Sequence, residues 1–189
     1  MGPKPLMLLS AATLIIAACN RGDNSPQAQL ENLEAEDTVL TNDVVAATPT
    51  TAQEFANAAA ASDRFEIESS KLAAAAGQSA AVKTFANNMI KAHTASTEKL
   101  KTTVAGLPTP LTINDALNAE QQQLLDGLKG KSGAELDSAY GAAQVSAHQA
   151  TLDALNAYAA SGDNPALRQL ASGMIPTVTA HLNTAKGLK

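Results

Sequence analysis

The amino-acid sequence predicts an all-α protein, in which two helical hairpins joined by a longer crossover form a four-helix bundle. Apolar residues make up 45% of the 189 residues, but only 3% are aromatic and there is no tryptophan. Alanine supplies much of the apolar content and favours closely packed helices, whereas strands draw on β-branched and aromatic residues. From Thr51 onward the apolar positions follow a helical period, which segments rich in glycine and proline interrupt.

The first hairpin is expected to pair a helix over residues 51–76 with a second helix that ends at Gly106. Gly77, Gln78 and Ser79 break the first helix, and the Ser79 side chain is a candidate cap for the second. Inward-facing positions recur at steps of three and four residues, as in the seam of a bundle. They are Phe55, Ala58, Ser62, Phe65, Ser69, Leu72 and Ala76, then Val82, Phe85 or Ala86, Met89, His93, Ser96, Leu100 and Val104.

The crossover is expected to start with the Leu-Pro-Thr-Pro sequence of residues 107–110, which cannot be helical, and to contain a short helix over residues 118–128. A third long helix follows, because Ser132 and Glu135 have the spacing of a capping box. Pro165 occupies the first position of the fourth helix. The inward positions of these two helices are Leu136, Tyr140, Gly141, Val145, His148, Leu152 and Leu155, then Leu167, Leu170, Met174, Val178, His181 and Ala185.

The N-terminal segment has the features of a bacterial lipoprotein signal peptide, which we place at residues 1–18. Lys4 precedes an apolar run that ends at Ile16 and is too short to span a bilayer. Ile16-Ala17-Ala18-Cys19 resembles the lipobox, in which small residues precede the cysteine that is acylated. Stable attachment takes two or more acyl chains. We therefore expect cleavage before Cys19, a membrane anchor of palmitate-like chains on that residue, and a place in the cell envelope. Because Asn20 follows the cysteine where Asp would signal inner-membrane retention, the outer membrane, facing the periplasm, is expected.

Charge is unevenly distributed between the three expected segments of the chain. The net charge is +1 for residues 1–18, −5 for residues 19–51 and −1 for residues 52–189. Segment 19–51 is polar, acidic and contains proline, so we predict that it is a disordered tether. Residues 52–189 are predicted to form the folded domain. A nearly neutral domain has no basic face to attract nucleic acid, so a nucleic-acid partner is not expected. The chain also lacks the glycine-rich, GxSxG and paired-cysteine motifs of common enzymes, so the hypothesis of an enzyme is less favoured.

Three histidines are candidate metal ligands, because they are the only histidines of the chain and each lies on the apolar stripe of a different helix. Together with Glu66 at the edge of the first helix, His93, His148 and His181 form a plausible set for zinc, copper or iron. The alternative is that each histidine is a buried polar residue satisfied by a neighbour such as Tyr140, Gln144, Ser96 or a carboxylate. We favour the alternative, since buried polar residues of this kind also fix helix register.

Two observations argue against a metal site at these histidines. Ferritin-type di-iron sites place a glutamate three residues before the ligating histidine, but Ile90, Val145 and Val178 occupy those positions here. Counted from the turns, His181 also lies roughly four residues, or ~6 Å, deeper in the bundle than the other two histidines. Helix tilt or a kink at Pro176 would be needed to close that gap.

Several sequence segments resemble the bacterial family described as domain of unknown function 4142 (DUF4142), over residues 52–188. They are Phe65-Glu66-Ile67-Glu68 with Leu72-Ala73, the run from Val82 to His93, Asp137 with Tyr140 and His148, and Ile175-Pro176 with His181-Leu182. The resemblance implies a ferritin-like bundle in an exported protein, often an outer-membrane one, of unestablished activity. Ala92 stands where the family usually has Asp, which removes a possible polar partner of His93, and Leu136 stands where Phe is frequent.

Three functions are therefore open at this point. The first, which we favour, is a non-enzymatic envelope lipoprotein that is anchored through Cys19 and binds an unknown envelope partner or acts in stress adaptation. The second is a metal-binding or metal-buffering bundle that uses the inward-facing histidines. The third is an enzyme with an unrecognised site.

Overall fold

The computed structural model of the chain describes residues 48–188, and within this range it contains five helices and no strand. The expected signal peptide, Cys19 and most of the expected tether lie outside the described residues. None of the described helices is long and apolar enough to cross a membrane. The helices are α1 (Ala52–Ala76), α2 (Ala80–Ala105), α3 (Ala119–Leu128), α4 (Gly133–Ser161) and α5 (Pro165–Ala185).

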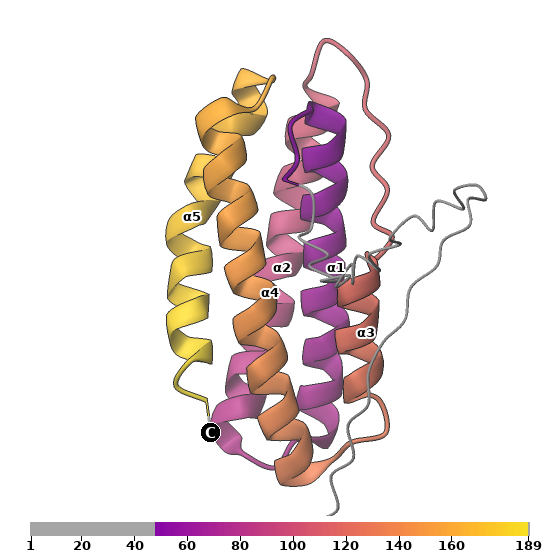
Figure 1. Cartoon of the computed structure of the whole chain (residues 1–189), viewed down its shortest axis with the longest axis vertical. Helices are drawn as coiled ribbons and strands as arrows, with labels where there is room; N and C mark the ends of the chain where they lie inside the picture. The colour runs from indigo at the N-terminus through magenta and orange to yellow at the C-terminus, as the bar shows by residue number, and fades with distance from the viewer. Residues whose placement is uncertain (1–47, 189) are drawn as a thin grey trace, which may run out of the picture. The chain divides into compact units, whose positions relative to one another are not determined.

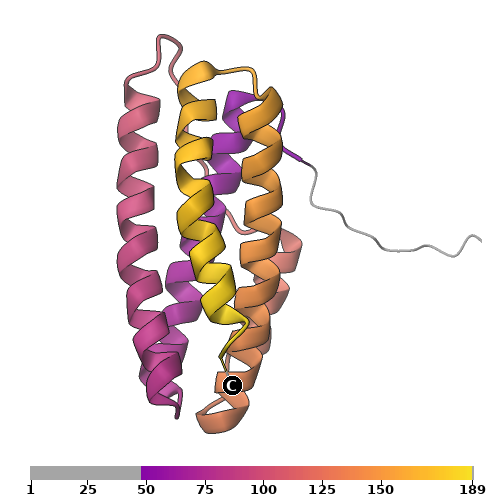
Figure 2. The same cartoon turned by 90° about the vertical axis from the view of Figure 1, so that its left-hand side faces the viewer.

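The four long helices form the predicted bundle of two hairpins, α1 with α2 and α4 with α5 (Figure 1). The chain leaves α2 at one end of the bundle and returns along α1 through the crossover, so that α4 starts at the opposite end (Figures 1 and 2). The short helix α3 lies at the end of the crossover and packs against α1 and α4. The prediction of an all-α bundle with a short helix in its crossover is confirmed.

The helix starts are capped at other residues than the two that the sequence predicted. Thr51 and Glu54 form a capping box at α1, and Asn118 does the same with Gln121 at α3. Neither Ser79 nor Ser132 makes the predicted side-chain cap, and Glu135 instead pairs with a lysine of the preceding turn. These two predictions were wrong, because sequence spacing alone does not show which neighbour reaches the free amides.

Asp137 of α4 takes the place of a local cap at the start of α2. Its carboxylate accepts hydrogen bonds from the backbone amides of Gln78 (3.0 Å) and Ser79 (2.7 Å). A side chain at Gly77 would collide with this arrangement, because an added Cβ would lie 2.6 Å from the Ala73 carbonyl oxygen and 2.7 Å from Asp137 Oδ1. The glycine therefore lets the α1–α2 turn close onto the carboxylate that ties it to the second hairpin.

The buried side chains form two separate hydrophobic cores, one at each end of the bundle. The first surrounds Phe55 of α1 and includes Tyr158, whose ring stacks on it at 4.2 Å. The second surrounds Phe65 and includes Tyr140, whose hydroxyl shares a 2.7 Å hydrogen bond with Ser70. Between them along all four helices lies a set of polar residues, here called the polar layer: Ser62, Asp63, Glu66, Ser69, His93, Gln144 and His148, which are buried, and His181, which is half-buried.

Most of the predicted inward positions are buried, but two on α1 are exposed. Ala58 and Ala76 face solvent, whereas their neighbours Ala59 and Ala73 are buried. A straight helix has 3.6 residues per turn, so a strict three-and-four pattern drifts off the core over 25 residues. The surface of α1 therefore carries more small residues than the pattern predicts.

Candidate metal centre

The three histidines of the bundle converge inside the polar layer. One nitrogen from each of His93, His148 and His181 lies within 4.8 Å of the others. The ring centroids are 5.5 to 5.7 Å apart. The gap of about four residues expected for His181 is therefore closed, because counting from the turns ignores how α5 tilts and shifts against α2 and α4.

His93 of α2 is held by a carboxylate from α1. Its Nδ1–H donates a 2.8 Å hydrogen bond to Asp63 Oδ1, and Thr97 donates to the other oxygen of that carboxylate. Because a carboxylate accepts, this bond places a proton on Nδ1, so Nε2 is the nitrogen that is free when the ring is neutral. His93 Nε2 is buried and has no hydrogen-bond partner among the described residues.

His148 of α4 has the same tautomer for a different reason. Its Nδ1–H donates a 2.9 Å hydrogen bond to the carbonyl oxygen of Gln144, one turn earlier on the helix. A carbonyl can only accept, so the free nitrogen is again Nε2, which is buried and unpartnered within residues 48–188. His181 contributes a third such atom, its buried Nδ1. Each ring thus presents one nitrogen without a partner.

Glu66 lies behind His148 and is not one of the converging atoms. Its Oε1 is 3.3 Å from His148 Nδ1, the nitrogen that already bonds to the Gln144 carbonyl. Both carboxyl oxygens of Glu66 are buried and make no hydrogen bond to the described residues under the usual geometric limits. Of the four candidate ligands, the structure therefore brings the three histidines together and leaves Glu66 outside this cluster, beside His148.

Burial and neighbouring charge set the pKa values of the polar layer. Burial, aided by the charge of His93, lowers the pKa of His148 to about 3 and that of His181 to about 4. Burial also acts to lower the pKa of His93, but the hydrogen bond that its ring donates to Asp63 and the charges of Glu66 and Asp63 outweigh burial and raise that pKa. Burial raises the pKa of the Glu66 carboxyl to about 7. His148 and His181 are therefore neutral at pH 7, the form in which imidazole binds metal.

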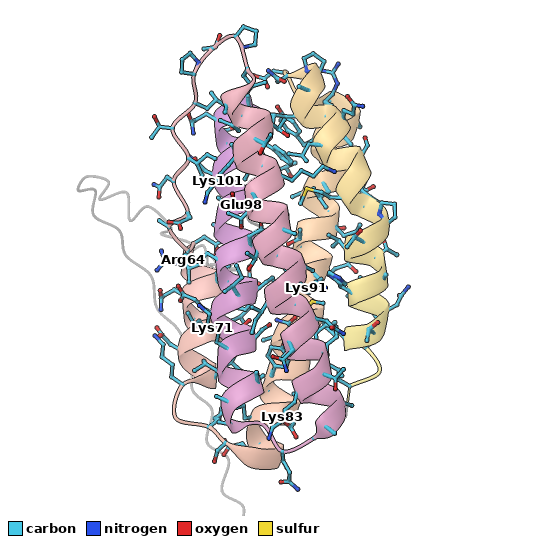
Figure 3. All side chains as sticks on the ribbon, turned by 180° about the vertical axis from the view of Figure 1, so that it is seen from behind. Arg64, Lys71, Lys83, Lys91, Glu98 and Lys101 are labelled. Carbon is cyan, nitrogen blue, oxygen red and sulfur yellow. The ribbon has the colours of Figure 1, made fainter. Side chains whose placement is uncertain are left out.

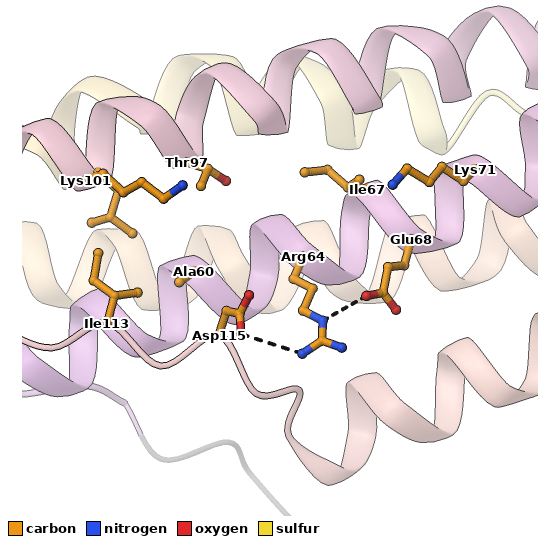
Figure 4. Close-up of a pocket in the computed structure, with 10 residues that line it drawn as sticks. Ala60, Arg64, Ile67, Glu68, Lys71, Thr97, Lys101, Ile113 and Asp115 are labelled. Atoms are coloured by element: carbon orange, nitrogen blue, oxygen red, sulfur yellow. Dashed lines mark hydrogen bonds and ion pairs between the residues drawn. The ribbon is translucent and has the colours of Figure 1, made fainter.

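A larger hollow lies elsewhere, on the outer side of α1 and α2 beside the crossover (Figure 4). It has a volume of about 390 Å³, but its charged groups largely neutralise one another. Arg64 pairs with Glu68 at 2.8 Å and with Asp115 at 3.6 Å, and Lys101 pairs with Glu98 at 3.0 Å. This groove contains no histidine and no unpartnered buried polar atom, so it offers less chemistry than the polar layer.

The outer surface of the first hairpin is more basic than the net charge of the domain suggests. Basic side chains lie along α1 and α2 (Figure 3), whereas Asp63 and Glu66, two of the acids of α1, are buried. Counting charges along the chain does not show which of them reach solvent. The basic residues are Arg64, Lys71, Lys83, Lys91, Lys99 and Lys101, with exposed or half-exposed acids Glu54, Glu68 and Glu98 on the same helices.

Sequence reasoning missed Asp63, the residue that orients His93. Asp63 is three residues before Glu66, a spacing that places both acids on one face of a helix. Asp63 also directly follows Ser62, which was expected to face inward. Its three-residue spacing from Glu66 was therefore the signal in the sequence that could have identified Asp63. The polar partner that appears lost with Ala92 is thus supplied from the neighbouring helix.

Fold and site together define an all-α protein with a histidine-rich layer buried between two hydrophobic cores. The chain belongs to the family described as "Domain of unknown function (DUF4142)", whose model matches residues 40–188. None of the curated proteins compared with the chain is similar to it.

A solved structure described as "CopM in the Cu(II)-bound form" is similar to this chain in fold. The two superpose with a TM-score of 0.60 and 16% sequence identity, over 72% of this chain and 94% of that one. At this identity the similarity establishes a shared helical-bundle fold.

Proposed function

We propose that the chain is a non-enzymatic, metal-binding envelope lipoprotein that holds one transition-metal ion between His93, His148 and His181. The convergence of the three rings carries this proposal, because one nitrogen of each ring lies within 4.8 Å of the others. Each ring also has one buried nitrogen without a hydrogen-bond partner among the described residues. Buried polar atoms are normally hydrogen-bonded, so unsatisfied imidazole nitrogens in such a cluster are explained by a ligand that accepts electron pairs. The alternative preferred from the sequence is met in part, because Asp63 and the Gln144 carbonyl each accept a hydrogen bond from one histidine nitrogen. The proposal rests on the remaining nitrogens.

The distances suit a metal after a small adjustment. Metal–nitrogen bonds to histidine are about 2.0–2.1 Å long, so nitrogens around a tetrahedral ion are ~3.3 Å apart. The present upper limit of 4.8 Å closes to that value if each ring moves by about an ångström towards the centre, which side-chain rotation allows. The remaining coordination position is free for water or another small ligand.

The surrounding groups favour zinc or copper. Neutral imidazoles suit zinc, copper and iron, but non-haem iron sites usually include a carboxylate ligand, and Glu66 lies behind His148 rather than beside the free nitrogens. Asp63 orients His93 as outer-shell carboxylates commonly orient ligating histidines. Its negative charge also offsets part of the charge of a buried cation. The Cu(II)-bound form of CopM shows that a bundle of this fold is compatible with a bound metal.

Metal titration of the chain from residue 19 onward tests the proposal, with Cys19→Ala present so that no thiol competes for the ion. We expect one Zn²⁺ or one copper ion per chain and a melting temperature that rises with metal concentration, because an ion that binds only the folded state stabilises it. A chain that binds neither ion with this stoichiometry contradicts the proposal.

The positioning role of Asp63 gives a graded prediction for the same titration. Asp63→Asn keeps the size of the side chain but weakens its hold on the His93 ring, so metal affinity should fall by about 10–100-fold. Tyr140→Phe is the matched control, since it removes a buried hydrogen bond outside the polar layer and should leave the affinity unchanged. Equal losses in both variants would show that the effect of Asp63 is general destabilisation.

We also propose that the chain is anchored in the bacterial outer membrane by lipid on Cys19. The apolar run before Ile16-Ala17-Ala18-Cys19 and the acidic segment after it support this localisation. Cys19→Ala should leave an unprocessed precursor or release the protein from the membrane fraction, which immunoblotting of fractionated cells would show. Normal cleavage and unchanged membrane retention would contradict the anchor.

A further inference from the structure

A small cavity lies directly beside His93, and neither of the other two histidines lines it. Its volume is about 40 Å³, enough for a water molecule or a bare metal ion. His93 and Asp63 line its inner end, and these residues are 5% and 2% exposed. Its wall also includes Met174 of α5, so the cavity touches all four long helices.

The cavity leads from the polar layer towards the surface between α1 and α4. Thr151, which lines the cavity, is three residues after His148 and therefore ~4.5 Å further along α4. Its outer lining includes Ala58 of α1, which is exposed, and Ala154 of α4, which is half-exposed. Because both side chains are small, few atoms separate the cavity from solvent between α1 and α4.

The polar atoms along this path suit a passing cation. Ser62 Oγ and Thr151 Oγ1 share a 2.8 Å hydrogen bond that links α1 to α4 at the cavity wall. The Asp63 carboxylate lies at the inner end and attracts positive charge towards His93. The rest of the cavity wall is apolar and includes Phe55, Ala59, Leu155 and Val178 of the first hydrophobic core. Apolar groups offer no oxygen to replace the water that an ion must shed, so the polar side chains of the wall are the groups that can assist its passage.

We propose that metal ions reach and leave the three-histidine site through this cavity, by crossing the seam between α1 and α4 at Ser62 and Thr151. The inference rests on the proposed metal site and adds the path by which it is loaded. The half-buried His181 of α5 marks the other place where the layer meets solvent, and the experiment below distinguishes the two.

Rates of metal uptake and release test this path, measured by stopped-flow absorption with Co²⁺ and an external chelator on the chain from residue 19 with Cys19→Ala. Ala154→Leu fills the outer part of the cavity and should slow both rates at least about tenfold. Because uptake and release cross the same barrier, the equilibrium affinity should stay unchanged. Ala58→Leu, at an exposed position on the other side of the seam, should act in the same direction and serves if Ala154→Leu does not fold.

Two matched substitutions outside the cavity serve as controls for the proposal. Ala150→Leu adds the same group to α4 at an exposed position outside the cavity, and Ala180→Leu adds it on α5 next to His181. Both should exchange metal at the rate of the unsubstituted chain. Wild-type rates in Ala154→Leu and Ala58→Leu, or slow exchange in Ala180→Leu alone, would overturn the path while leaving the metal site intact. A chain that takes up no metal before any substitution would overturn the proposed function and the path together.

Discussion

His148→Leu is expected to abolish metal-dependent stabilisation while leaving the metal-free bundle at least as stable as before. Removing one of three ligands should lower affinity by more than the ~100-fold that loss of an outer-shell partner can cost. His148 Nε2 is buried without a partner among the described residues, and the Nδ1–H bond of the ring goes to a carbonyl of its own helix. Replacing the ring by an apolar side chain therefore removes one unsatisfied polar atom and one local hydrogen bond, two effects that offset each other. Thermal unfolding with and without Zn²⁺ measures both effects in one experiment.

The sign of the change in the metal-free protein separates a ligand from a structural histidine. If His148 mainly holds the bundle together, His148→Leu should lower the melting temperature of the metal-free chain, and added metal should still raise it. Tyr140→Phe provides the comparison, because loss of its hydrogen bond to Ser70 should cost about 1 kcal/mol and leave the response to Zn²⁺ intact.

The metal-free protein is expected to lose stability as the pH falls from about 6.5 to 4.5. Folding lowers the pKa of His148 to about 3 and that of His181 to about 4, from 6.5. In this window both rings gain a proton when the chain unfolds, so acid favours the unfolded state. Glu66 acts in the opposite direction, because its pKa is raised from 4.5 to about 7 and it releases a proton on unfolding. Near pH 5 the net uptake from these three groups is close to one proton, and it falls towards pH 6.5, where His93, whose pKa is raised, also releases protons on unfolding.

Variants isolate this contribution from that of other acids such as Glu54, whose pKa is lowered to about 2 by hydrogen bonds from Thr50 and Thr51. Glu66→Gln should make stability depend more steeply on pH between 4.5 and 6.5, and His148→Leu should make it less steep. Urea unfolding of the chelator-treated protein at pH 4.5, 5.5 and 6.5 gives these slopes. Identical slopes in the two variants would show that the polar layer does not control acid stability.

The fold could be predicted because it follows from local features of the sequence. The alanine-rich helical period, the proline-containing segment at residues 107–110 and Pro165 at the start of α5 each act within a few residues. The cap at α2 was missed because Asp137 acts across a separation of 58 residues in sequence. Contacts of that kind depend on how the hairpins pack, and periodicity does not determine packing to within one turn.

The candidate site was predicted in its residues but not in its geometry. The apolar stripes identify His93, His148 and His181, and the structure places all three in one layer. Counting residues from the turns placed His181 deeper in the bundle than the other two histidines, because the count assumes straight helices of equal tilt. Asp63 was missed because its partner lies on another helix and 30 residues away, so its role appears only once α1 and α2 are packed together.

X-ray absorption spectroscopy of the zinc-loaded chain, compared with its His148→Leu variant, tests the metal centre most directly. The account predicts three nitrogen scatterers at about 2.0–2.1 Å with the outer-shell signals of imidazole rings, and a loss of the bound ion or of one ring in the variant. A first shell made of oxygen alone, with no imidazole signal and no change in the variant, would contradict it.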